Sequence, residues 1–373
     1  MGSEFDEIHD ELRAVARDLL VPTRPRAGSG SSPGPADWSQ MAQAGWLGLE
    51  VAEALGGAGA TFAEVAVILE ELGRAATASP YLGTVVLAAG ALALVDVSDG
   101  ADELRRAVAA GELAVAVVLG DGAADAVPAE VAFRLERTTG GLRLHGLARY
   151  VADAAGAEVV LLVALDPAGE PVLVRTGPDA AGLLVEPEEL VDETHAVASV
   201  SADGVVIGED DVWGFAGDGA TAVAHLADRA AVALALDALG LSRAMLDETV
   251  AYAAVREQFG RPIGSFQAVK HACADMLVQV TVAEELVGQA VAALVAGDPE
   301  ASTAASMAKA YATAAGVEVA GAAMQLHGGI GYTWESGVHV YLKRAVFDRA
   351  AFGSPRAHRH RIARRYPSPV PGG

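Results

Sequence analysis

The chain has 373 residues and a formal net charge of −23, from 26 lysines and arginines against 49 aspartates and glutamates. Such an acidic chain repels phosphate backbones, which argues against nucleic acid as a partner, and its length rules out a small disulfide scaffold and allows more than one structural unit. The composition is 52% hydrophobic but only 5% aromatic. Much of the apolar content is therefore alanine, valine and leucine, which suit closely packed helices.

The first third of the chain has the pattern of helices. Apolar residues recur at helical spacing in five segments, separated by a stretch rich in proline, glycine and serine over residues 21–36 and by glycine-rich breaks. The expected helices are Phe5–Leu20, Trp38–Leu47, Thr61–Arg74, Thr84–Leu94 and Ala101–Ala110. They predict an N-terminal helical domain over residues 1–111.

At about Glu112 the pattern changes to short runs of β-branched residues, which indicate strands. The expected strands are Leu113–Leu119, Val131–Arg137, Leu142–Val151, Val159–Leu165, Pro171–Arg175 and Ala196–Ile207. Two connections, residues 138–141 and 166–169, carry hairpin signals. We therefore expect a middle antiparallel β domain over residues 112–216 and not a nucleotide-binding βαβ array.

After Trp213 helical spacing returns for the rest of the chain. The expected helices are Ala220–Val255, Phe266–Ala296, Ser302–Leu326 and Gly337–Phe347. Four long helices predict a C-terminal bundle over residues 217–373. The expected fold class is α+β, mainly α: a helical domain, a small β domain and a four-helix bundle, in that order.

Residues 256–267 (REQFGRPIGSFQ) include side chains that can bind a diphosphate and a ring system at the same time. Arg256 offers forked donors to phosphate oxygens, and Phe259 offers a flat apolar face. Gln258 and Gln267 add side-chain amides. The ordinary alternative is that Arg256 simply ends a helix in a turn.

Residues 325–331 (QLHGGIG) form a second motif of the same kind. After Gln325, the glycines Gly328, Gly329 and Gly331 allow backbone N–H groups to approach a phosphate closely. The alternative is that Gly328 and Gly329 only cap a helix.

Three N-terminal motifs accompany these two, namely GWLGL at 45–49, LGG at 55–57 and EELGR at 70–74. In this order, the five motifs resemble the acyl-CoA dehydrogenase family over essentially the full length. The resemblance implies the fold given above, assembly as dimers of dimers, and FAD as the cofactor, held between two subunits. One subunit would contribute Arg256, Gln258, Phe259 and Gln267, and the other Gln325, Gly328, Gly329 and Gly331.

The chain departs from the family at the catalytic base. The family oxidises an acyl thioester by moving an α-proton to a carboxylate while the β-hydrogen leaves as hydride, and so weak a carbon acid requires that carboxylate. The two positions at which relatives carry it fall on Phe352 and Ala230, neither of which can accept a proton. No catalytic residue is therefore expected. Asp228 is the one nearby carboxylate that could substitute, whereas Asp237 is expected to be structural.

The part of the site where the reaction takes place differs from the family pattern at other positions as well. The polar loop that packs beside the flavin ring in relatives is not recognisable in residues 118–124. His195 ends a segment in which relatives often have Asp-x-Thr-Arg, and Ser354 and Arg356 replace the usual Thr and Gln. The residues expected to bind the diphosphate of the cofactor therefore match the family, whereas those around the flavin ring and the base do not.

Some bacterial relatives that act on CoA thioesters of steroid side chains are similar in this respect, because they pair a base-bearing with a base-less subunit in a heterotetramer. The resemblance implies that this chain is the base-less subunit. Its expected partners are a second acyl-CoA dehydrogenase subunit, an acyl-CoA substrate and an electron-transferring flavoprotein. Two alternatives stay open: a homomeric enzyme that uses Asp228, and a non-catalytic acyl-CoA-binding protein.

The sequence also bears on compartment and metal binding. Cys273 is the only cysteine, which excludes an internal disulfide and fits a reducing cytoplasm. No uninterrupted apolar run reaches about 18 residues and the acidic start lacks a cationic signal region, so we expect a cytoplasmic protein with no membrane partner. No metal is expected, because His358 and His360 would face different directions on a helix.

Overall fold

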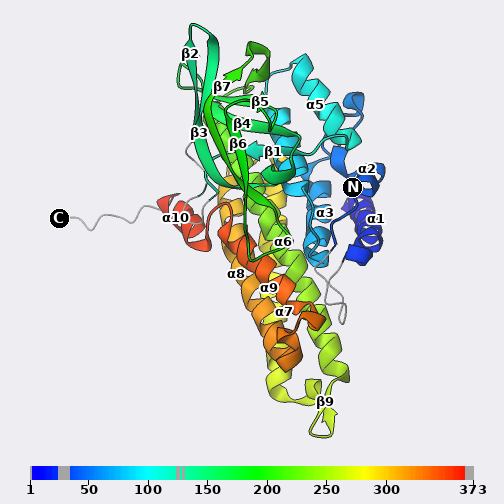
Figure 1. Cartoon of the computed structure of the whole chain (residues 1–373). Helices are drawn as coiled ribbons and strands as arrows, with labels where there is room; N and C mark the ends of the chain where they lie inside the picture. The colour runs from blue at the N-terminus through cyan, green and yellow to red at the C-terminus, as the bar shows by residue number, and fades with distance from the viewer. Residues whose placement is uncertain (1, 24–33, 123–126, 128–130, 366–373) are drawn as a thin grey trace, which may run out of the picture.

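A computed structural model describes residues 2–23, 34–122, 127 and 131–365, and it confirms the expected fold class. The N-terminal helices and the β sheet both pack near one end of a long helical bundle, as Figure 1 shows. The other end of the bundle extends away from them and carries a small hairpin at its tip. The domain limits at 111/112 and 216/217 stay predictions.

The N-terminal part is helical as expected, with α3 at its centre. This helix begins with a capping box, in which the Glu64 carboxylate accepts from the backbone N–H of Thr61 at 2.8 Å. Two expected helices differ in detail: the one from Trp38 is cut short where Gly45 takes a φ of +77°, and the one from Thr84 begins as a π-helix. The elements are α1 (Gly2–Leu20), α2 (Trp38–Gln43), α3 (Phe62–Ala75), η4 (Leu82–Ala89), α4 (Gly90–Leu94) and α5 (Asp99–Ala110).

The middle part is a sheet in the order β6-β7-β3-β2-β4-β5-β8, with β1 paired to β4. Both hairpins are confirmed, since β2 pairs with β3 and β4 with β5 in antiparallel fashion. Most pairings are antiparallel as expected, but β1 and β2 both run parallel to β4, which the sequence did not predict. The strands are β1 (Val115–Val118), β2 (Phe133–Thr138), β3 (Gly141–Ala152), β4 (Val159–Leu165), β5 (Pro171–Thr176), β6 (Leu183–Glu188), β7 (Val197–Ile207) and β8 (Val212–Gly214).

Sequence reasoning missed β6 and β8. β6 (LLVEPE) is short, and most of its residues are not buried, so it lacks the apolar alternation of a core strand. β8 has three residues. Part of the segment in which the flavin-ring loop was sought, residues 123 and 124, lies outside the described residues.

The C-terminal part contains the four expected helices and one more, α10, which follows a short loop. α10 is rich in arginine and histidine, so the apolar spacing that predicts a helix is almost absent from it. The elements are α6 (Gly219–Val255), β9 (Glu257–Gln258), β10 (Arg261–Pro262), α7 (Gln267–Ala296), α8 (Ala301–His327), α9 (Val338–Ala350) and α10 (Pro355–Arg365).

One helix bears on the expectation of no membrane span. α7 (Gln267–Ala296) is long and apolar enough to cross a membrane by length and composition, and 28% of its most apolar stretch is buried. Counting only uninterrupted apolar runs misses it, because polar residues interrupt the helix. A single helix of this kind is weak evidence for a span. In this structure α7 packs along α8 and α6.

α3 and α6 cross with their backbones in direct contact, and two glycines make this possible. A Cβ on Gly73 would lie 2.2 Å from the carbonyl oxygen of Asp237, and one on Gly240 would lie 1.9 Å from that of Glu70. Glu71 belongs to the same EELGR motif (residues 70–74) as Gly73, and its carboxylate accepts a hydrogen bond from Arg17 at 3.0 Å. The EELGR motif is therefore explained by helix packing alone.

Substitution of Gly240 by alanine is expected to destabilise the protein by about 3 kcal/mol, because the added methyl group meets backbone and not a side chain that can move. The matched control is Gly288→Ala in α7, where a Cβ would have nothing within 4 Å. That change should stabilise by about 0.5–1 kcal/mol through helix propensity. Urea unfolding of both variants is the measurement, and equal effects would contradict the close crossing.

Candidate functional site

The two predicted cofactor motifs lie at the same end of the bundle. Beyond α6 the first motif forms the hairpin β9–β10, in which Gln258 pairs with Arg261, and Figure 1 places this hairpin at the tip of the molecule. The second motif begins in the last turn of α8. The rings of Tyr252 in α6 and His327 in α8 stack with centroids 4.4 Å apart, which fixes the two helix ends against each other.

The first motif presents its side chains to solvent. Phe259 occupies the hairpin turn with a φ of +53°, a conformation uncommon for a bulky residue, and its ring is 92% exposed. Arg261 lies over the ring of Phe266 at 4.2 Å, so the motif holds a second guanidinium besides that of Arg256. All five side chains predicted to touch the cofactor are exposed: Arg256, Gln258, Phe259, Gln267 and Gln325.

The three glycines of the second motif do not have equal roles in the fold. Gly328 caps α8 with a φ of +65°, and its N–H donates to the carbonyl of Gln325. Gly331 is required by packing, because a Cβ there would lie 2.5 Å from the carbonyl oxygen of Met324. Gly329 has nothing within 4 Å of its Cβ position. Helix capping therefore accounts for Gly328, while the open space at Gly329 fits the close approach of a ligand.

The loop between α9 and α10 contains Phe352, which the family resemblance predicts to stand in place of the base. Phe352 and Gly353 both have positive φ, +52° and +95°, and Phe352 is 6% exposed. A Cβ on Gly353 would lie 3.0 Å from the His358 ring. A bulky residue in this conformation must be held by its surroundings.

Two buried side chains hold the loop, and sequence reasoning assigned neither of them to it. Lys309 of α8 is fully buried and donates from Nζ to the carbonyls of Asp348 at 2.6 Å and Gly353 at 3.1 Å. His358 of α10 places Nε2 3.0 Å from the carbonyl of Phe352. Burial lowers the pKa of Lys309 to about 7 and that of His358 to about 4. The only signal for Lys309 in the sequence is a lysine within a run of small apolar residues.

The alternative base positions lie on α6. Ala230 is fully buried, and next to it Arg229 is ion-paired with Glu50. Asp228 is 2% exposed, and both of its carboxylate oxygens are engaged, by Arg361 of α10 and by the Ser302 hydroxyl.

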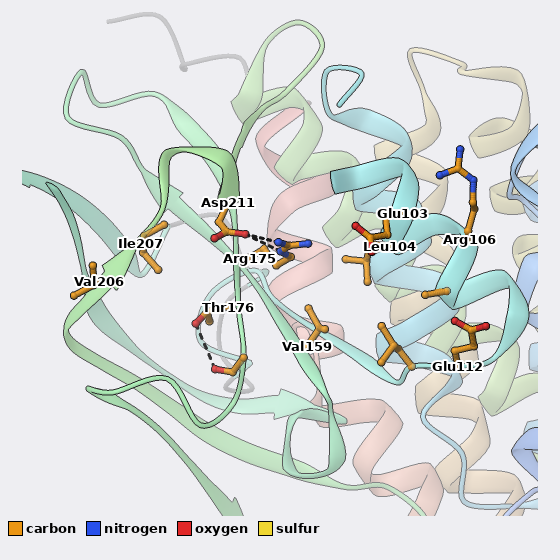
Figure 2. A pocket seen from close by; sticks show the side chains of 13 residues that line it. Glu103, Leu104, Arg106, Glu112, Val159, Arg175, Thr176, Val206, Ile207 and Asp211 are labelled. Carbon is orange, nitrogen blue, oxygen red and sulfur yellow. Dashed lines mark hydrogen bonds and ion pairs between the residues drawn. The ribbon is translucent and has the colours of Figure 1, made fainter. Parts of the chain in front are cut away.

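A cleft of about 600 Å³ lies between α5 and the sheet, and Figure 2 shows its lining. Arg175 and Asp211 form an ion pair across one side of it, at 2.7 Å. None of the predicted site residues is among those that line it. The cleft is therefore separate from the candidate site.

Comparison with known proteins agrees with this arrangement. Residues 3–112 match the acyl-CoA dehydrogenase N-terminal domain, and residues 217–366 match the C-terminal domain. Acyl-CoA dehydrogenase IpdE2 of Mycolicibacterium smegmatis is 32% identical over 365 residues, which cover 97% of this chain and 98% of that protein.

Two solved structures are similar over almost the whole chain. The Tcur3481-Tcur3483 steroid ACAD G363A variant is 29% identical with a TM-score of 0.81, covering 97% of each chain. The ChsE4-ChsE5 complex from Mycobacterium tuberculosis is 26% identical with a TM-score of 0.82, covering 97% of this chain and 98% of that one. On the motifs, the fold and these matches, the chain belongs to the acyl-CoA dehydrogenase family.

Proposed function

We propose that this chain is a subunit of a heteromeric acyl-CoA dehydrogenase that contributes cofactor-binding residues but no catalytic carboxylate. A base-bearing partner subunit of the same family completes the enzyme, which oxidises an acyl-CoA thioester between the α and β carbons. The observation that carries this proposal is the phenyl ring of Phe352, buried at the position where a base would lie.

The surroundings of Phe352 support a lasting loss of the base. The loop backbone is held from two sides, by Lys309 and by His358, around a side chain that cannot titrate. No rearrangement of this loop would turn a phenyl ring into a proton acceptor. The α-proton must therefore pass to a carboxylate that another chain supplies.

The contacts of Asp228 argue against its use as a substitute base. Its two oxygens accept from the Arg361 guanidinium and from the Ser302 hydroxyl, so both are already engaged within the protein. Its use would also require α10 to move, because Arg361 belongs to that helix. A homomeric enzyme based on Asp228 is thus the less favoured alternative.

FAD is the cofactor of the acyl-CoA dehydrogenase family, and the exposed residues at the end of the bundle fit it. Arg256, with Arg261 nearby, would bind diphosphate oxygens, and the Gln258, Gln267 and Gln325 amides would orient the rest of the nucleotide. Phe259 would stack on a ring, and the open backbone at Gly329 would lie against a phosphate. When bound, FAD accepts the β-hydrogen as hydride.

The surface of α7 supports assembly with another subunit. Four of its apolar side chains are between 38% and 61% exposed, namely Leu277, Val278, Val282 and Val295. Exposed apolar side chains on one long helix are a surface on which another chain can pack. The similarity to the ChsE4-ChsE5 complex supports a related subunit as the occupant, in a heterotetramer.

The remaining parts of the proposal come from relatives. The steroid acyl-CoA dehydrogenase that this chain resembles supports a steroid side-chain thioester as the substrate. An electron-transferring flavoprotein as electron acceptor, and the cytoplasm as compartment, follow from the family resemblance and the single cysteine.

Co-expression with a neighbouring acyl-CoA dehydrogenase gene should give a complex that holds one FAD for each pair of chains, because the polar loop beside the flavin ring is not recognisable in this chain and the sites that depend on it would stay empty. Native mass spectrometry and the flavin absorbance measure this ratio. A yellow homo-oligomer of this chain with one FAD per chain, reduced by acyl-CoA unaided, would contradict the proposal. A colourless protein that binds acyl-CoA would instead favour the non-catalytic alternative.

Within that complex, Arg256→Gln should weaken FAD retention about tenfold or more, because a charge-assisted hydrogen bond to phosphate is lost. Arg256→Lys should give an intermediate loss, since lysine keeps the charge but not the fork. The control is Arg134→Gln, an exposed arginine paired with Glu136 on the β2–β3 hairpin. Flavin content after gel filtration is the readout, and equal retention in all three variants would remove Arg256 from the site.

A further inference from the structure

A group of buried charged side chains lies where the three parts of the chain meet. Arg344 of α9 is 4% exposed and binds both oxygens of Asp237 in α6, at 2.7 Å and 2.6 Å. Its remaining nitrogen donates to the carbonyl of Thr77, near the end of α3, and to the hydroxyl of Thr194, which precedes β7. One guanidinium thus joins the N-terminal helices, the sheet and the bundle.

Asp348, one turn after Arg344 on α9, is different from the other charged groups of this junction. It is fully buried, and neither of its carboxylate oxygens has a hydrogen-bond donor from a neighbouring N–H or O–H group. The oxygens of Asp348 and Asp237 and a ring nitrogen of His195 lie within 4.8 Å of one another. A buried carboxylate with no donor is costly, so the atoms around it must balance its charge in another way.

The titratable and charged groups that face the junction come from five segments. They are Asp153 after β3, Asp192 and His195 before β7, Asp237 on α6, Lys309 on α8, and Arg344 and Asp348 on α9. Four carboxyl groups therefore share one permanently charged guanidinium. Lys309 directs its Nζ to the backbone carbonyls of Asp348 and Gly353, and not to the Asp348 carboxyl.

Two of the other carboxyl groups have partners of their own. Asp192 lies 2.6 Å from Nδ1 of His195 and accepts from Thr194 at 2.7 Å. Asp153 accepts from the backbone N–H of Gly83 at 2.8 Å. The polar neighbours of Asp348 are the carboxylate of Asp237, both oxygens of which Arg344 already binds, and the ring of His195, whose Nδ1 lies beside Asp192 and which makes no hydrogen bond to Asp348.

We propose that Asp348 and Asp237 share one proton: Asp348 carries it and donates a hydrogen bond to the ionised carboxylate of Asp237. This shared proton stabilises the junction at which the three parts of the chain pack together. The proton gives Asp348 a donor, leaves Asp237 ionised for Arg344 and removes the repulsion between two adjacent carboxylates. Docking of α9 against α6, α3 and the sheet is then linked to protonation, and a rise in pH loosens it.

The electrostatics agree with the direction of this linkage. Burial and the charge of Asp237 raise the pKa of Asp348 well above its ordinary value of 3.8, whereas Arg344 keeps the pKa of Asp237 low although burial alone would raise it. A carboxyl whose pKa is higher in the folded state binds its proton more tightly there. Its contribution to stability is full below about pH 4 and is lost as pH rises through the folded-state pKa.

The test compares Asp348→Asn with the wild type, as the full chain and within its complex. Asparagine keeps the shape and the donor of a protonated carboxyl but cannot ionise. Between pH 5 and pH 8 the thermal midpoint of the variant should rise by about 2 °C or more relative to that of the wild type. Asp179→Asn, an exposed carboxyl in the turn between β5 and β6, is the matched control and should follow the wild type at every pH.

A second measurement can be read from the pH dependence of the wild type itself, with the variant as a cross-check. The infrared spectrum of the wild type at pH 7 should contain the C=O band of a protonated carboxyl group, which disappears at high pH and is absent from Asp348→Asn. A constant difference in thermal midpoint across pH, or no such band, would overturn the proposal. So would a gain in wild-type stability with Zn²⁺ or Mn²⁺ that the variant lacks, because a cation would then balance the two carboxylates.

Discussion

The guanidinium of Arg344 is the contact on which the arrangement of this chain depends. It takes both oxygens of Asp237 from α6, the carbonyl of Thr77 and the hydroxyl of Thr194, so that three segments far apart in the sequence are held by one planar group. Arginine suits this role because its donors are fixed in one plane and its charge does not titrate. Loss of this side chain would leave Asp237 and Asp348 buried together without a permanent counter-charge.

The same helix connects the junction to the base-position loop. α9 carries Arg344 and Asp348, and the loop with Phe352 follows directly at its end. Lys309 donates both to the carbonyl of Asp348 and to that of Gly353, so the end of α9 and the loop share one anchor. The loop with Phe352, the predicted base position, is therefore held by contacts with α8. These contacts explain how the loop keeps its backbone conformation although the side chain of Phe352 cannot accept a proton.

The fold and the two cofactor motifs could be predicted from sequence because each has a local pattern: helical spacing, hairpin turns, and an arginine or glycines at fixed offsets. The junction could not. Asp237 and Asp348 have the appearance of polar-face residues on their own helices, and only the crossing of α6 and α9 turns them into a buried pair. α10 and β6 were missed for the opposite reason, since exposed polar elements carry little periodic signal. The parallel pairing of β1 and β2 with β4 is set by tertiary packing, and hairpin turns in the sequence do not predict it.

The central claim is that this chain supplies no base, and proton exchange tests it most directly. The complex of this chain with its base-bearing partner, in which the partner's catalytic carboxylate is replaced by an amide, is incubated with acyl-CoA in D₂O. Mass spectrometry then follows deuterium at the α carbon. The proposal predicts no exchange above that of free acyl-CoA, because Phe352 and Ala230 cannot take the proton and Asp228 is bound to Arg361. Exchange that persists, and that is lost in Asp228→Asn, would contradict it and assign the base to this chain.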